Sequence, residues 1–175
     1  PQYVGPTFSS LQELLFTPIL LTGLFRDILV KHFQEWQNRD PALRSLVWRD
    51  DSAANILVES IHRWTPQQTG KHPAVVIKRQ GYQNRRVGIN DQNLGNNIDR
   101  EGARRFETFW IGSHTLFCLG SEGAQAEVLS TEVQRELTQF GPAIRESLGL
   151  MRFQVAEIGA IAELEEAERT FVVPV

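Results

Sequence analysis

Three short stretches of the chain carry residues that could do chemistry, and each lacks a residue that the chemistry needs. Gly70-Lys71 matches the end of a phosphate-binding loop, but Thr65 stands where the first glycine belongs and His72 replaces the magnesium-binding Ser or Thr. The turn at 120–123 has a serine between two glycines and is one residue too short for a nucleophile elbow. The stretch from Asp91 begins like a calcium loop but lacks its central glycine and its closing glutamate.

The titratable residues do not complete a catalytic or metal site either. The four histidines stand at positions 32, 62, 72 and 114, with no pair four residues apart and no cysteine partners, so no zinc site is predicted. Glu163, Glu165 and Glu166 could pair for acid–base work, but a turn without apolar walls gives no reason for a raised pKa. The sequence therefore predicts no enzyme, no metal and no cofactor.

Charge is distributed unevenly along the chain. Between Lys78 and Arg105 there are seven basic residues against three acidic ones. The candidate basic residues are Arg85, Arg86, Arg100, Arg104 and Arg105. An acidic block follows, made of Glu157, Glu163, Glu165, Glu166 and Glu168.

These two charged stretches have three interpretations. They are solvated faces that keep the protein soluble, or the basic loop of one subunit meets the acidic turn of the next in a head-to-tail ring. In the third interpretation the arginines face phosphate groups.

Composition limits the protein class. A chain of 175 residues that is 41% hydrophobic can fill one core, so a single domain is expected. The net charge of −3 argues against a protein whose main function is to bind nucleic acid. Cys118 is the only cysteine and lies in an apolar run, which predicts a buried, inert thiol. The apolar run at 14–21 is too short to span a membrane and has no basic segment before it.

Hydrophobic periodicity predicts an α+β fold, with a small mixed or antiparallel sheet packed against an N-terminal helix and a long helix in the C-terminal half. Residues 1–16 are expected to form an extended arm, tethered to the surface or reaching onto a neighbouring subunit, and 17–175 to form one domain. Helices are predicted at 18–37 and from Ala126 to Phe140. Strands are predicted at 47–49, 55–64, 74–79, 106–119, 152–158 and 171–175, and a long polar loop at 81–105 with a short β-ribbon around 86–89.

Two features of the C-terminal half carry specific predictions. The apolar residues of the long helix recur in steps of three and four, which predicts a core formed by Leu129, Val133, Leu137 and Phe140. Pro174 cannot donate to a central ladder, so the final strand is predicted at a sheet edge, with Phe171 and Val173 contacting a neighbouring subunit.

The order of these elements resembles the tail-terminator and neck proteins of tailed bacteriophages. The resemblance covers about residues 15–175 and rests on pattern, because these families have no invariant motif. In them a variable loop is followed by strand, helix, strand and strand. The closest local match is Ser147-Leu148-Gly149-Leu150 leading into 152–158, then an acidic turn and Phe171–Val175. The arm and the long middle loop depart from the pattern, which leaves open whether the chain is a terminator or a neighbouring neck component.

The resemblance implies a structural virion protein, made in the host cytoplasm and without enzymatic activity. It implies a homo-oligomer, a ring of six subunits at the head-proximal end of the tail, which ends tube polymerisation. The implied partners are the tail tube and the neck or connector proteins, with DNA only as cargo passing through the lumen and no membrane. The alternatives are another phage ring, such as a head-tail adaptor, a stopper or a baseplate-proximal ring, and a non-viral α+β oligomerisation module.

Overall fold

The computed structural model describes residues 18–35, 56–65, 73–84, 94–98, 104–107, 110–147, 150–164 and 170–175. The predicted arm at 1–16, the strand predicted at 47–49 and the ribbon predicted around 86–89 lie outside these residues.

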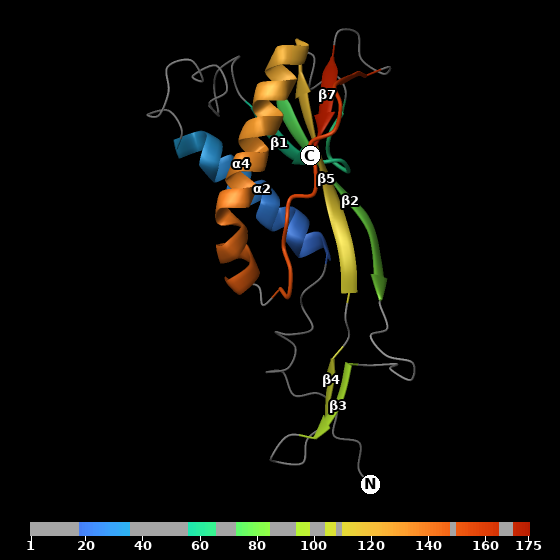
Figure 1. The fold of residues 1–175 in the computed structure, drawn as a ribbon. Coiled ribbons are helices and arrows are strands. Elements are labelled where there is room, and N and C mark those ends of the chain that lie inside the picture. The colour runs from blue at the N-terminus through green and yellow to red at the C-terminus, as the bar shows by residue number, and fades with distance from the viewer. Residues whose placement is uncertain are drawn as a thin grey trace. The chain divides into compact units, whose positions relative to one another are not determined.

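The chain divides into two compact units, one formed by Pro1–Lys78 with Thr115–Val175 and the other by Arg79–His114. Two helices and seven strands make up the described part (Figure 1). The helices are α2 (Pro18–Glu35) and α4 (Gly123–Ser147), and the strands are β1 (Leu57–Ser60), β2 (Ala74–Asn84), β3 (Leu94–Ile98), β4 (Arg104–Glu107), β5 (Trp110–Gly120), β6 (Ala162–Glu163) and β7 (Phe171–Pro174). The boundary between the units falls within β2 and within β5.

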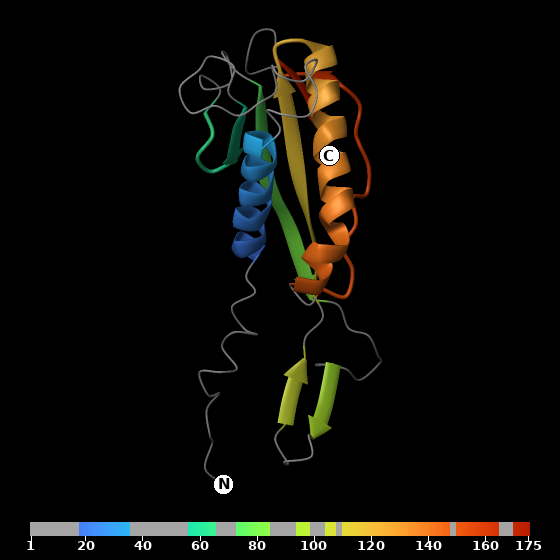
Figure 2. The same cartoon turned by 90° about the vertical axis from the view of Figure 1, so that its left-hand side faces the viewer.

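The first unit is built on a five-stranded sheet in the order β1-β2-β5-β7-β6. The sheet is mixed, because β1 runs parallel to β2 while β7 is antiparallel to both β5 and β6. Both helices lie on one face of this sheet (Figures 1 and 2). The predicted α+β class, with an N-terminal helix and a long helix on a small mixed sheet, is therefore confirmed.

Helix α2 buries the apolar stripe that its sequence predicts. Leu21, Phe25, Leu29 and Phe33 are spaced by four residues and are all buried. This spacing keeps the side chains on one side of a helix with 3.6 residues per turn. The stripe faces the sheet and α4, and this packing stabilises α2 more than its intrinsic helix propensity does.

Helix α4 confirms most of the predicted core and corrects one residue. Leu129, Val133 and Leu137 are buried, whereas Phe140 is 45% exposed, so its assignment to the core was wrong. Ile144 continues the buried stripe, and α4 therefore extends to Ser147 although Pro142 lies inside it. The ring that packs on this turn, next to Gly141, is that of Phe153, which lies outside the helix.

The Cδ1 atom of Phe153 lies 3.3 Å from where a Cβ on Gly141 would be, which is tight contact with the helix backbone. The ring centroids of Phe153 and Phe25 are 5.8 Å apart, so Phe153 also joins α4 to α2. A Cβ at 141 would fit only if this ring shifted by a few tenths of an ångström.

The other face of the sheet carries a second, smaller apolar cluster. Ala74, Val76 and Leu119 are its buried members, and Trp64 and Phe117 pack against it. Side chains of a strand alternate between faces, so the intervening Val75, Ile77 and Cys118 point towards the helices. Strand β1 is shorter than predicted and ends at Ser60, after which a turn brings Trp64 onto this cluster.

The segment predicted as a polar loop at 81–105 contains more regular structure than expected. Strand β2 continues to Asn84, and β3 and β4 form an antiparallel pair in which Leu94 is opposite Glu107 and Ile98 is opposite Arg104. The predicted strand at 106–119 is divided between the end of β4 and β5.

The chain after α4 also differs from the prediction. Residues 151–161, here called the return segment, contain no strand, so the strand predicted at 152–158 was wrong. Strand β7 lies between β5 and β6 and is not the edge strand that Pro174 suggested. Val175 exchanges two backbone hydrogen bonds with Leu116 of β5, so the ring nitrogen of Pro174 points to the opposite side, beyond the two residues of β6. No ladder hydrogen bond to β5 is lost there.

Candidate functional site: a buried histidine between two carboxylates

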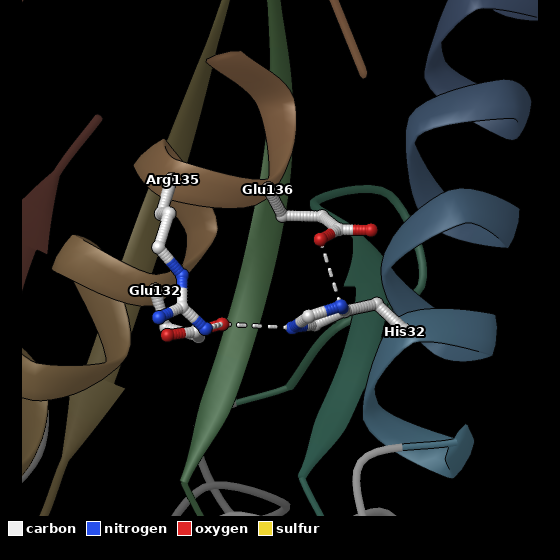
Figure 3. Close-up of polar contacts among 4 residues, drawn as sticks. All are labelled: His32, Glu132, Arg135 and Glu136. Atoms are coloured by element: carbon white, nitrogen blue, oxygen red, sulfur yellow. Dashed lines mark hydrogen bonds and ion pairs between the residues drawn. The ribbon is translucent and has the colours of Figure 1, made fainter. Parts of the chain in front are cut away.

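The most concentrated polar chemistry in the described part lies between the two helices. The Nε2 atom of His32 is 3.0 Å from Oε1 of Glu132, and its Nδ1 atom is 2.8 Å from Oε2 of Glu136 (Figure 3). The side chain of His32 is 5% exposed and those of the two glutamates are 7% exposed. Arg135 bonds to the same Glu132 oxygen at 2.5 Å from the solvent side, where its own side chain is 54% exposed.

Helical geometry places these groups together. Glu132 and Glu136 are one helical turn apart on α4, so both carboxylates project towards the same side. Each directly precedes a buried residue of the apolar stripe, Val133 or Leu137, and therefore lies at the border of that stripe. His32 precedes the buried Phe33 on α2, and its ring stacks edge-on against the Phe33 ring with centroids 5.2 Å apart. The cluster thus forms where the borders of two apolar stripes meet.

Both contacts of His32 can be hydrogen bonds only when the imidazole and the two carboxyl groups together carry two protons. An ionised carboxylate only accepts hydrogen bonds, and a neutral imidazole donates from one nitrogen only. Both contacts are hydrogen bonds when the imidazole carries two protons or when one carboxyl carries one. In the first case the charges of His32 and Arg135 balance those of Glu132 and Glu136 within one small volume.

This arrangement is suited to joining two helices. Both ring nitrogens are directed at carboxylates on one helix, which fixes the rotation and the height of α2 against α4. Among the residues that the structure describes, no group of three or more His, Cys, Asp or Glu side chains is arranged to hold a metal ion. We interpret the cluster as a clamp that joins α2 to α4, here called the His32 clamp.

The sequence identified only one member of the clamp. His32 lies on the apolar side of the helix predicted at 18–37, which favours a partly buried residue with satisfied polar groups over a metal ligand, and its burial and two polar contacts agree with this. Glu132 and Glu136 were missed. The signal that could have found them is their spacing, which places two like charges beside an apolar stripe where they repel each other unless a cation lies between them.

The predicted subunit interface is only partly within the described residues. Glu163 is exposed on β6, and Arg104 and Arg105 belong to β4. The other charged candidates, Arg85, Arg86, Arg100, Glu165, Glu166 and Glu168, lie outside the described residues. The predicted contact between the basic and acidic stretches of two subunits stays a prediction, because most of its residues lie outside the described part.

The two apolar interface candidates have different positions. Phe171 is half-buried and pairs with Gly120 and Glu163 across its neighbouring strands. Val173 is 1% exposed and pairs with Cys118, so it is part of the core and its assignment to a subunit interface was wrong. Its side chain faces the helices because residues of β7 alternate between the two faces of the sheet.

Two further titratable side chains have environments that alter their chemistry. The thiol of Cys118 is buried, and desolvation strongly raises its pKa, in agreement with the predicted inert thiol. In the second unit, desolvation raises the pKa of Tyr82, and the charge of Arg79 partly offsets this. The Tyr82 hydroxyl lies 3.2 Å from Nδ1 of His114, and its ring covers Gly112 so closely that a Cβ there would overlap the ring.

None of the described helices is long and apolar enough to cross a bilayer. No protein family matches the sequence, and searches of curated proteins and of solved structures give no significant match.

Proposed function

We propose that this chain is a structural subunit of a tailed-bacteriophage particle, a tail terminator. Six copies form a ring at the head-proximal end of the tail, where the ring stops polymerisation of the tail tube and joins the tail to the neck. The partners are then the tube and connector proteins, with DNA passing through the lumen.

The order of elements in the C-terminal half carries this proposal. Strand β5, helix α4 and strands β6 and β7 are consecutive elements of the chain, with β6 in the place of the strand that was predicted at 152–158 and is absent. This is the order of strand, helix, strand and strand that follows a variable loop in the terminator and neck proteins the sequence resembles. The position of that loop in the sequence corresponds here to Arg79–His114, which forms its own compact unit.

The exposed apolar residues support self-association. In the described part nine large apolar side chains are more than 40% exposed. Three of them, Met151, Ile158 and Ile161, belong to the return segment and are 77%, 41% and 45% exposed. Single exposed apolar side chains are ordinary, but several on one short segment are typical of a surface that another protein covers.

The proposal is tested with the full chain and a purified tail-tube protein. Native mass spectrometry should give a species of about 119 kDa, which is six copies of the 19.9 kDa chain, and negative-stain images should show rings. When the chain is added to polymerising tube protein, the tubes should become shorter as the ratio of chain to tube protein rises, because each ring blocks one growing end.

The outcomes separate the candidates. A ring that leaves tube length unchanged but binds the connector would identify an adaptor or stopper. A ring that binds neither protein would indicate a general oligomerisation module. A chain that stays monomeric at every concentration, alone and with tube protein, would refute all ring functions.

A further inference from the structure

The return segment is almost fully extended. Its Phe153 lies against Gly141, and Cγ2 of Ile161 is 3.8 Å from where a Cβ on Gly123 would be. Gly123 and Gly141 are about 27 Å apart along the helix, at about 1.5 Å per residue. The chain from Phe153 to Ile161 reaches only about 26–29 Å when fully stretched, so it must run back along α4 as an extended strand-like chain.

At its C-terminal end, from Gly159 onward, this extended chain joins the edge of the sheet. On the inner side, Gly159 N–H donates to the Pro174 carbonyl at 2.7 Å, and β6 pairs with β7. Strand β6 is the outermost strand in the order of the sheet, and no described strand pairs with its outer side. Extended backbone presents N–H and C=O groups on both sides, so the outer side is ready to pair with another strand.

The exposed side chains along this edge are apolar and acidic. Ile158 and Ile161 are exposed, and Glu157 and Glu163 are exposed acidic residues on the same stretch. The sequence of 152–158 has the alternating pattern of a strand, although within one subunit it has no partner strand among the described residues. Its strand propensity is therefore not used by any strand of the described part.

We propose that the outer edge formed by the return segment and β6 accepts a strand from a second copy of this chain. The strand is the part of β2 beyond its pairing with β1, Lys78–Asn84. Its exposed Lys78 and Arg79 lie on opposite faces of that strand and place positive charge beside Glu157 and Glu163 of the first copy. The donor and acceptor surfaces differ, so the contact is head-to-tail, as a closed ring requires. This inference rests on the proposed ring and names the contact that closes it.

Hydrogen exchange measured on the full chain tests the contact without any mutation. Peptides covering 151–163 should exchange rapidly in dilute monomer. In the assembled form they should exchange about tenfold or more slowly, because their amides then exchange only when the added strand opens. A ring in which these peptides stay as fast as in the monomer overturns this contact and leaves the proposed ring intact. A chain that is monomeric at all concentrations overturns both.

Charge reversal tests the identity of the second surface. The double substitution Glu157→Lys with Glu163→Lys should abolish assembly in analytical ultracentrifugation. Adding Lys78→Glu with Arg79→Glu to the same chain should restore at least part of it. The matched control reverses two exposed glutamates at the start of α4, Glu122→Lys with Glu127→Lys, and should assemble like the wild type.

Circular dichroism establishes that each variant is folded before its assembly is compared. A folded four-site variant that is as monomeric as the first double variant overturns the pairing with Lys78 and Arg79. Equal loss of assembly in the control variant also overturns it, because the effect would then come from net charge alone.

Discussion

Removing the imidazole of the His32 clamp should destabilise the protein more than any single surface change. In His32→Ala, Glu132 and Glu136 remain buried at 7% exposure without the group that both face. Removing one partner of a buried charged cluster costs about 3–5 kcal/mol, because the remaining charges stay desolvated. With a urea m-value of about 2 kcal/mol/M, the unfolding midpoint should fall by about 1.5–2.5 M.

Two matched variants separate the charge effect from lost packing. Replacing the whole cluster with apolar residues, as His32→Leu with Glu132→Met and Glu136→Met, should restore most or all of the stability, since no buried charge is left. Arg135→Ala should cost less than about 1 kcal/mol because that side chain is mostly in solvent. The assay is urea unfolding followed by far-ultraviolet circular dichroism at one fixed protein concentration.

The reasoning fails if His32→Ala lowers the free energy of unfolding by less than about 1 kcal/mol. That result would mean that water reaches the carboxylates. It also fails if the apolar triple variant is as unstable as His32→Ala. The loss would then come from altered packing and not from buried charge.

The core and the second unit provide three further tests. Leu137→Ala should cost about 2–5 kcal/mol in urea unfolding, whereas Phe140→Ala, at a partly exposed position on the same helix, should cost much less; equal costs would refute the burial of Leu137 and the exposure of Phe140. Cys118 should not react with a disulfide reagent at pH 8 until the chain is unfolded, because burial raises the pKa of its thiol; rapid labelling of the native protein would contradict this. The raised pKa of Tyr82 means that its neutral form is favoured in the fold, so its stabilising contribution is complete below the ordinary tyrosine pKa of 10.0 and is lost as pH rises through the folded value. Stability should therefore fall more steeply above about pH 10 in the wild type than in Tyr82→Phe, and identical profiles would exclude the effect.

The sequence predicted those parts of the fold that follow from local periodicity. The stripe of Leu129, Val133 and Leu137 could be found because a helix repeats its face every three or four residues. The class of the fold followed from the alternation of such stripes with β-rich runs. Phe140 was assigned wrongly because periodicity gives the side of a helix but not the segment that packs there, which is Phe153.

The errors at the sheet edge have a different physical origin. Strand propensity at 152–158 shows that a segment can pair, but not whether a partner strand lies beside it. Pro174 shows that one hydrogen bond is missing, but its direction depends on the pairing register with Phe117. Glu132 and Glu136 could not be assigned to the clamp because their partner, His32, is separated from Glu132 by 100 residues.

This separation has a consequence for the newly made chain. Helix α2 leaves the ribosome long before the residues of α4 that cover its apolar stripe and its histidine. At about 5–20 residues per second, the interval is about 5–20 seconds. During that time the stripe of α2 can contact strand β1 but not α4, and the neighbouring imidazole has no carboxylates. Synthesis of this protein therefore passes through a stage in which chaperones that bind short apolar helices can compete with folding.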